Sequence, residues 1–258
     1  MTDRRLSFDG AAAEYEIGRP GYPPALFEML AERCSLSPGA HVLEIGSGPG
    51  QATEGLIEAG AIVTAVEPGE RFARRLAERF ELAVLNAFFE DVELEPESFD
   101  LAMSATAFHW VDHEIGLPKI LDALRPGGWL ALTWARFYDP EHPVAFTAAS
   151  QPIMHRHVPE YRGALTPVED ESPWTERLGG AGFTEVESHR HPWTRTETTE
   201  QVIARFLTHS GPLSLDETGK QALVADLRQL CDDRFDGTVP QAYVTVTHLG
   251  RKPVSSAR

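Results

Sequence analysis

Short apolar runs alternate with amphipathic stretches along the first half of the chain. Between the apolar runs, apolar positions recur every three or four residues, as at Phe72, Leu76 and Phe80, which is typical of helices that bury one face. Apolar strands separated by helices predict a parallel sheet covered on both faces. The predicted strands lie at residues 41–45, 61–67, 82–85, 99–105 and 128–135.

The regular alternation ends near residue 136. Residues 138–174 are proline-rich and irregular, with one helix expected near 146–155. A helix, a glycine turn and a strand follow over 175–191, then helices over 198–211 and 215–235 and a last strand at 241–249. These helices are placed to cover the carboxyl edge of the sheet, where open α/β folds bind ligands. The expected fold class is α/β, with a doubly wound, mostly parallel, seven-stranded sheet and helical cap insertions.

The same pattern predicts how the chain is divided. We expect an N-terminal helical segment over 1–35, a ligand-binding core over 36–136, and an insertion with a helix over 137–182. The last strands are expected over 183–250, interrupted by a helical cap insertion at 196–236, with a tail over 251–258.

Charge and hydropathy narrow the possible partners. The 258 residues are 42% hydrophobic and carry a formal net charge of −16. So acidic a surface repels a phosphate backbone, so we expect no nucleic-acid partner. No apolar run reaches the roughly 18 residues that span a membrane, and the N-terminus lacks the apolar centre of a signal peptide. We therefore expect a cytoplasmic protein with no membrane partner, either a monomer or a homodimer.

Cysteine and histidine spacing gives no metal motif. Cys34 and Cys231 are the only cysteines and neither belongs to a C-x-x-C motif, which fits a reducing compartment. The pairs His155-x-His157 and His189-x-His191 lack a second ligand set at standard spacing. We therefore expect no metal site.

A glycine turn follows the first predicted strand and indicates the kind of ligand. Gly46, Gly48 and Gly50 form G-x-G-x-G, whereas the dinucleotide fingerprint G-x-G-x-x-G would place a glycine where this chain has Gln51. Glu44 lies two residues before the turn, where an acid disfavours a phosphate and favours a cation. Glu67 ends the second strand and is placed to accept hydrogen bonds from ribose hydroxyls. S-adenosylmethionine (SAM) has a sulfonium, an ammonium and a ribose without phosphate, so it fits this pattern.

At this point the chain resembles the class I SAM-dependent methyltransferases, whose fold is a Rossmann-like α/β sheet. The resemblance rests on Glu44-x-Gly46-x-Gly48-x-Gly50, on Glu67-Pro68, and on the blocks ESFDLAMSATAFHWVD at 97–112 and LRPGGWLAL at 124–132. Residues 8–30 and the AFHWVD phrase are similar to the small-molecule branch typified by trans-aconitate methyltransferase (methyltransferase type 11), in which the N-terminal segment helps to close the pocket.

The resemblance implies a set of site residues. The glycine turn would contact the methionine part of SAM, the acid after the second strand the ribose, the loop after the third strand the adenine, and the end of the fourth strand the sulfonium. An N-terminal segment and the phrase after the fourth strand would line the acceptor pocket. The expected cofactor residues are Glu44, Gly46, Ser47, Gly48, Gln51, Glu67, Pro68, Ala87, Phe88, Ser104 and Ala105, and the expected pocket residues are Tyr15, Arg19, Tyr22, Phe108 and Trp110.

Three residue roles stay open at the level of sequence. His109 is a candidate general base near neutral pH, or it only shapes the pocket floor. Arg19 is a candidate partner of the cofactor carboxylate or of an acidic substrate, or it forms a surface salt bridge. Phe88 or Phe89 could stack on adenine while the other packs in the core.

The expected function is methyl transfer from SAM, with S-adenosylhomocysteine (SAH) as product, to a small-molecule acceptor at O, N or C, mainly by positioning in a closed pocket. Aromatic residues of the second half suggest a partly apolar acceptor: Phe137, Tyr138, Phe146, Trp174, Trp193 and Phe206. The alternatives are a nucleic-acid or protein methyltransferase, which the Ser104-Ala-Thr-Ala-Phe108 turn and the charge disfavour, and an NAD-dependent oxidoreductase, which the glycine spacing disfavours.

Overall fold

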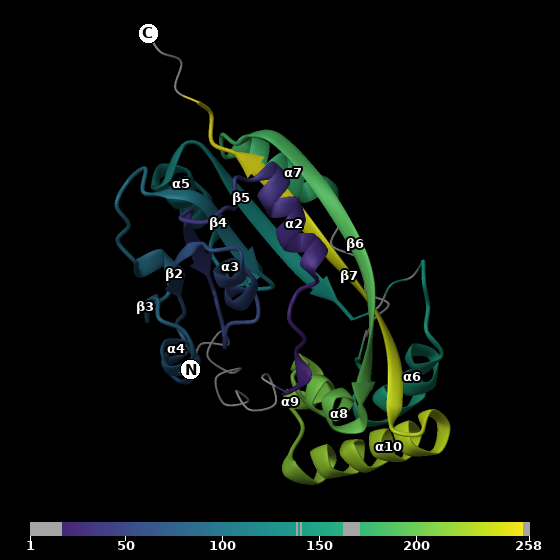
Figure 1. The fold of residues 1–258 in the computed structure, drawn as a ribbon. Helices are drawn as coiled ribbons and strands as arrows, with labels where there is room; N and C mark the ends of the chain where they lie inside the picture. Colours follow the sequence, from purple (N-terminus) through teal and green to yellow (C-terminus); the bar gives the residue numbers. More distant parts are fainter. Residues whose placement is uncertain (1–16, 138, 140, 162–170, 255–258) are drawn as a thin grey trace.

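A seven-stranded sheet forms the centre of the computed structural model, which describes residues 17–137, 139, 141–161 and 171–254 (Figure 1). The strand order is β3-β2-β1-β4-β5-β7-β6, and β7 runs antiparallel to both of its neighbours. This topology confirms the predicted fold class. The strands are β1 (His41–Ile45), β2 (Ile62–Val66), β3 (Ala83–Leu85), β4 (Phe99–Ala105), β5 (Leu124–Arg136), β6 (Thr184–Thr198) and β7 (Thr238–Arg251).

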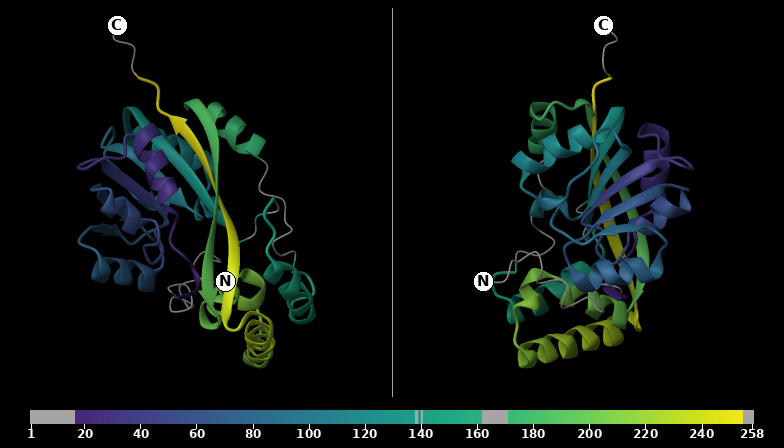
Figure 2. Two further views of the ribbon diagram at one scale, coloured as in Figure 1. Left: turned by 45° about the vertical axis from the view of Figure 1, so that its right-hand side comes forward. Right: turned by 90° about the vertical axis from the view of Figure 1, so that its left-hand side faces the viewer.

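Helices cover both faces of this sheet, as the views in Figure 2 show. On one face, α2 (Pro24–Arg33) and α3 (Thr53–Glu58) pack onto β1 and β4 through a core that includes Leu30 and Leu56. On the other, α5 (His113–Ala123) and α7 (Glu171–Gly180) pack through a core that includes Ile120. The amphipathic helix α4 (Glu70–Arg79) follows β2 and buries Phe72 and Leu76, as its spacing predicts.

A separate group of helices lies past the carboxyl ends of the parallel strands (Figure 1). We call α6 (Ala145–His157), α8 (Thr199–Leu207), α9 (Ser210–Leu213) and α10 (Glu217–Phe235) the roof. The roof has its own apolar core, in which Phe146 of α6, Phe206 of α8 and Leu227 of α10 are buried. In the part of the chain that the structure describes, no helix is long and apolar enough to cross a membrane.

The antiparallel strands β6 and β7 join the roof to the sheet. Pairing between β5 and β7 ends at Arg136 and Val244, whereas pairing between β6 and β7 continues to Thr198 and Thr238. Six residues of β7 therefore project beyond β5, a reach of roughly 20 Å at about 3.3 Å per residue. The sequence pattern predicts a shorter strand that ends at residue 191, before Pro192 and the charged residues that follow it. As an edge strand, however, β6 tolerates both.

Two further boundaries differ from the sequence prediction. The first helix after the glycine turn begins at Thr53 rather than near Gly50, because Gly48 and Gly50 adopt positive φ angles of 55° and 100°, which no helix contains. Residues 125–128, predicted as a turn, lie within β5, where the pairing with β4 shifts register after Phe99.

Candidate cofactor and acceptor site

The glycine turn between β1 and α3 is built for close approach to neighbouring elements. Gly46 has φ 71°, and a Cβ there would lie 2.4 Å from the Cβ of Ala107. A Cβ at Gly50 would lie 2.7 Å from Cε2 of Phe80, next to α4. Left-handed backbone and lack of space both require glycine at these positions. The turn therefore lies against the loop that follows β4.

Glu67 is fixed at the carboxyl end of β2. Its Oε2 accepts the N–H of Gly48 at 2.8 Å, and its Oε1 accepts the N–H of Gly69 at 2.7 Å. The Asn86 side-chain amide donates to the carbonyl oxygens of Glu67 at 2.8 Å and of Pro68 at 3.2 Å. A carboxylate accepts about four hydrogen bonds, so this group has the capacity to hold the turn and to serve ligand hydroxyls.

Glu44 is buried beneath the turn. Its Oε2 accepts the Thr53 hydroxyl at 2.6 Å, which fastens the first residue of α3 to β1. Burial raises the pKa of Glu44 to about 7, although the bond from Thr53 opposes this. Among the described residues, Glu44 Oε1 has no hydrogen-bond partner, so the turn holds a buried acceptor that a ligand N–H group would satisfy.

The last residues of β4 differ in exposure: Ser104 is buried, whereas Ala105 and the following Thr106 are partly accessible. Ser104 is fully buried and donates to the Ile45 carbonyl at 2.8 Å. This hydroxyl ties β4 to β1, and the expected place of Ser104 at the sulfonium end of SAM stays a prediction. Ala105 and Thr106 are half-buried. Thr106 has φ 57°; its Oγ1 accepts the Ala135 N–H at 3.2 Å and shares a 2.8 Å hydrogen bond with the Tyr22 hydroxyl.

The phrase after β4 is also divided between core and surface. Phe108 is fully buried and stacks on His113 with ring centroids 5.4 Å apart, so its side chain packs in the core, and its place in the acceptor pocket stays a prediction. His109 is exposed, and its Nδ1 accepts the Trp134 Nε1–H at 3.4 Å. Its ring centroid lies 4.9 Å from that of the half-buried Trp110. The His109 ring is thus oriented by Trp134 and exposed to solvent. This geometry fits either of the two expected roles, general base or pocket wall.

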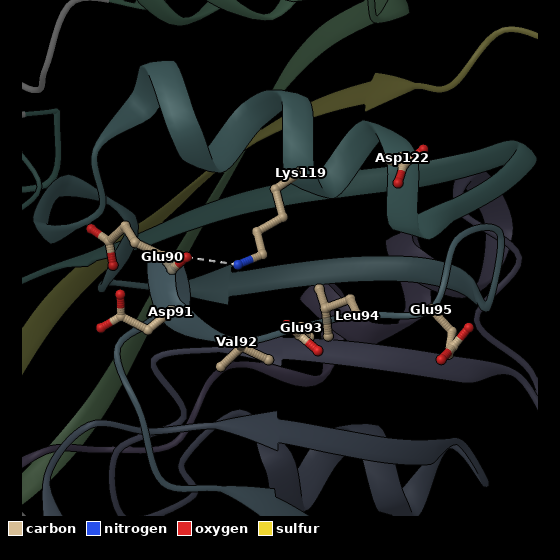
Figure 3. Close-up of a pocket in the computed structure, with 8 residues that line it drawn as sticks. All are labelled: Glu90, Asp91, Val92, Glu93, Leu94, Glu95, Lys119 and Asp122. Carbon is tan, nitrogen blue, oxygen red and sulfur yellow. Dashed lines mark hydrogen bonds between the residues drawn. The ribbon is translucent and has the colours of Figure 1, made fainter.

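The loop after β3 resolves which phenylalanine is accessible. Ala87 and Phe88 are half-buried, whereas Phe89 is buried in the core. Lys119 of α5 donates to the carbonyl oxygens of Phe89 at 2.8 Å and Glu90 at 2.9 Å. Beside this contact lies an open cavity of about 630 Å³, lined by residues 90–95, Lys119 and Asp122 (Figure 3). None of these lining residues is a predicted cofactor residue.

The N-terminal segment 17–22 bridges the roof and the sheet. A Cβ at Gly18 would lie 2.2 Å from the Arg205 backbone nitrogen of α8. Arg19 Nε donates to Thr208 Oγ1 at 2.8 Å, and its Nη2 donates to the Thr208 carbonyl at 3.2 Å. The Arg19 guanidinium also lies 4.5 Å above the ring of Phe137. Tyr15 lies outside the described residues.

Most aromatic residues of the second half serve the core. Phe146 and Phe206 are buried in the roof, and Trp174 is buried beside Trp134. Trp193 stacks on Tyr243 with centroids 4.4 Å apart. Tyr138 lies outside the described residues. Among these aromatics, Phe137 contacts the cationic residues around the roof, with Arg19 and Arg205 over its ring.

The two histidine pairs have other partners. His157 Nε2 lies 2.8 Å from Asp226, and His189 Nε2 lies 3.5 Å from Glu187. A short acidic cluster of Asp139, Glu141 and His142 brings its ligand atoms within 4.8 Å of one another, and Asp139 already accepts from Glu141 N–H and pairs with His142.

Sequence reasoning missed Arg205, Thr208 and His209. Arg205 lies in the apolar stretch VIARFL and is buried with Glu197, at 3.0 Å from its carboxylate. A single arginine within an apolar helical stretch is a signal for a buried charge, because arginine is almost never fully buried unless paired.

Comparison with known proteins agrees with this geometry. A family model described as a methyltransferase domain matches residues 43–132. An uncharacterized methyltransferase of Mycobacterium tuberculosis is 31% identical over 202 residues, which cover 78% of this chain and 75% of that protein. A trans-aconitate 2-methyltransferase of Paracidovorax citrulli is 30% identical over 173 residues, covering 65% of this chain and 57% of that protein. The solved structure of a proposed type II methyltransferase from Anaeromyxobacter dehalogenans matches with a TM-score of 0.64 at 25% identity, covering 91% of this chain and 98% of that one.

The chain therefore belongs to the class I SAM-dependent methyltransferases. It is an enzyme that uses SAM as its methyl donor. This assignment removes the alternative of an NAD-dependent oxidoreductase, as the absence of glycine at Gln51 predicts.

Proposed function

We propose that this methyltransferase acts on a small-molecule acceptor bound between the roof and the carboxyl edge of the sheet. The observation that carries the proposal is the bridge formed by residues 17–22. Arg19 bonds to Thr208 beside the roof, and Tyr22 bonds to Thr106 at the end of β4. A nucleic acid or folded protein would have to displace these contacts, whereas a small molecule has only to pass beside them.

The charge of the protein and one relative support the same acceptor class. A net charge of −16 opposes binding of a nucleic acid. The relative from Paracidovorax citrulli is named for a small organic acceptor. A monomer or a homodimer is compatible with a site built within one chain.

We also propose that SAM lies along the glycine turn. Gly46, Ser47, Gly48 and Gln51 would face its methionine part, with Glu44 supplying a buried acceptor. Glu67 and Pro68 would hold the ribose, and Ala87 and Phe88 would border the adenine. Ala105 and Thr106 would lie at the sulfonium end. Two acids at the turn and strand end, with a free Glu44 Oε1, support a cationic nucleoside without phosphate.

When bound, SAM would supply a methyl group, activated by its sulfonium, to a nucleophilic atom of the acceptor. The residues of this chain then act mainly by positioning and by excluding water. The roof and residues 17–22 would cover the reacting groups. His109 would take part as a base only for an acceptor that is protonated at neutral pH, and otherwise as a wall of the pocket.

The test is a SAH-release assay with purified protein and SAM. One panel contains small carboxylic acids, phenols and amines, and a second contains transfer RNA, ribosomal RNA and peptides. Turnover confined to the small-molecule panel is expected. Turnover on RNA or peptides alone would overturn the proposal and establish the alternative of a macromolecular acceptor. Calorimetric titration with SAH checks in parallel that the cofactor site is intact.

A further inference from the structure

Cationic side chains gather where the roof meets the end of β5. Arg205 of α8 has a side chain that is only 3% exposed, and its Nε donates to Glu197 Oε2 at 3.0 Å. Its guanidinium lies 4.9 Å from the ring of Phe206 and 5.6 Å from that of Phe137. Arg19 lies over the other part of the Phe137 ring at 4.5 Å. Two guanidinium groups thus share one aromatic residue.

Arg205 retains an unused donor. Within the described residues, its Nη2 is buried and has no hydrogen-bond acceptor. A buried charged N–H group without an acceptor is costly, and native proteins rarely keep one without a use. Arg205 Nη2 is part of a guanidinium, whose N–H groups form a planar fork that matches a carboxylate or another planar oxyanion.

The local charge balance leaves room for an anion. Among the described carboxylates, Glu197 is the one that contacts Arg205, and it also accepts from the Tyr243 hydroxyl and lies 3.8 Å from Arg195 Nε. His209 completes the cluster, with its ring 5.5 Å from that of Phe137. Burial, followed by the charges of Arg19 and Arg205, lowers the pKa of His209 well below its ordinary value. The cluster is thus cationic through its arginines in a chain whose net charge is −16.

The cluster adjoins the edge at which methyl transfer is proposed. Thr106 at the end of β4 accepts the Ala135 N–H, and Phe137 follows two residues later along the same strand direction. Two extended residues span roughly 7 Å. An acceptor held at the cluster would therefore reach the end of β4 with a body only a few bonds long.

We propose that Arg205 Nη2, with Arg19 and His209 beside it, binds the carboxylate of the methyl acceptor, while the ring of Phe137 packs against its apolar body. The acceptor class is then a small organic acid with an apolar or aromatic part. This proposal rests on the proposed small-molecule function and deepens it. A carboxylate suits the single free donor of Arg205, since a phosphate ester carries more charge and more acceptor oxygens than the described donors match.

Calorimetry on the SAH-saturated protein tests the proposal without requiring turnover. The probes are benzoate, 3-phenylpropionate, their neutral amides, and phenyl phosphate. The carboxylates are expected to bind about tenfold or more tightly than their amides, as for a charge-assisted hydrogen bond. Equal affinity for an acid and its amide would overturn the proposal. Preferential binding of phenyl phosphate would also overturn it, in favour of a phosphate site.

Two variants test whether Arg205 is the residue that binds the carboxylate. Arg205→Lys keeps the positive charge beside Glu197 but removes the fork that carries Nη2, so carboxylate affinity should fall about tenfold while SAH affinity stays within about twofold. Arg228→Gln is the matched control, because Arg228 of α10 pairs with Glu200 of α8 on the exposed surface of the roof. If Arg205→Lys leaves carboxylate affinity unchanged, Arg205 has only a structural role and the proposal fails.

The comparison of acid with amide uses the wild-type protein, so the proposal stays falsifiable if Arg205→Lys does not fold. Failure of the proposed function has a different signature. A protein that binds SAH but methylates only neutral phenols or amines would keep the small-molecule function and lose the carboxylate site. Turnover on RNA or peptides alone would overturn both the small-molecule function and the carboxylate site.

Discussion

The Glu67 carboxylate accepts the Gly48 N–H at 2.8 Å, so the end of the second strand holds the middle of the glycine turn. The same carboxylate accepts the Gly69 N–H at the start of α4. One buried acid therefore joins the glycine turn and the start of α4 to the end of β2. This geometry makes Glu67 a positioning group even before a ligand arrives.

Replacement of Glu67 by alanine should weaken SAM and SAH binding by about 1–3 kcal/mol, because a charge-assisted hydrogen bond and the tether of Gly48 are both lost. Calorimetric titration measures the change. Glu70→Ala is the control, since Glu70 is an exposed acid three residues away that pairs with Arg74 on its own helix. Equal affinities in the two variants would remove Glu67 from the site.

Gly46→Ala should damage the turn beyond the ordinary cost of a left-handed residue. An added Cβ would lie 2.4 Å from Ala107 Cβ and would push the loop after β4 away. Gly39 has φ 84° with nothing within 4 Å of an added Cβ, so Gly39→Ala carries the backbone penalty of about 1–2 kcal/mol alone. We expect both variants to lower thermal stability and only Gly46→Ala to reduce SAH affinity. A Gly46→Ala protein with wild-type SAH affinity would contradict the proposed position of SAM.

Stability should depend on pH through Glu44. Its pKa is about 7 in the folded protein and 4.5 ordinarily, because burial disfavours the charged form. The folded state therefore holds a proton that the unfolded state loses, so this contribution is complete below pH 4.5 and is lost as pH rises through 7. At about 1.36 kcal/mol per pKa unit, the loss is roughly 3 kcal/mol.

Urea unfolding between pH 4.5 and 8 measures the effect of Glu44. Glu44→Gln is neutral at every pH and keeps an acceptor for Thr53, so the difference in stability between wild type and variant should shift in favour of the variant as pH rises. Glu54→Gln replaces an exposed acid of α3, next to Thr53, and should leave the pH dependence unchanged. A wild-type pH profile in Glu44→Gln would show that Glu44 is ionised throughout.

His109 should contribute to the shape of the pocket more than to proton transfer. Its ring is exposed, and Trp134 donates to its Nδ1. We expect His109→Asn, which keeps an acceptor for Trp134, to lower kcat by less than about tenfold, whereas loss of a general base costs about 10²–10⁴-fold. Single-turnover rates measured across pH distinguish the two roles. A large loss that removes the acidic limb of the profile would make His109 the base.

The close packing of Gly18 on α8 predicts a local effect on the bridge. Gly18→Ala would place a Cβ 2.2 Å from the Arg205 nitrogen, and overpacking of this kind costs about 1–3 kcal/mol. The acceptor KM should rise because residues 17–22 move off the roof. Gly21→Ala, whose Cβ would meet its nearest atom at 3.7 Å, is the control. Thermal melts and limited proteolysis should distinguish the two variants, and identical behaviour would show that the bridge does not depend on this contact.

The fold and the cofactor turn follow from local patterns in the sequence. Strands such as 41–45 and 99–105 bury mostly apolar side chains, and Gly46 and Gly50 require glycine for reasons of φ and space. The strand pattern and the G-x-G-x-G spacing can be read from residues close in sequence, although the lack of space at Gly46 and Gly50 comes from the distant residues Ala107 and Phe80. The observed sheet order confirms the fold that the strand pattern predicts.

The acceptor side is less predictable because it depends on contacts between distant residues. Arg19 and Thr208 are 189 residues apart, and neither residue type reveals the partner. The sequence likewise gives Ser104 and Phe108 as site residues because they lie at a strand end. In the structure, tertiary packing turns Ser104 toward Ile45 and Phe108 into the core.

The overhang of β6 and β7 separates two kinds of evolutionary change. The pairing of β5 with β7 ends at Val244, and α8–α10 are inserted between β6 and β7 beyond that point. This insertion can therefore change in length or be exchanged without altering the register of the central strands. Selection for a new acceptor could then act on α8–α10, while the site for the methyl donor stays the same.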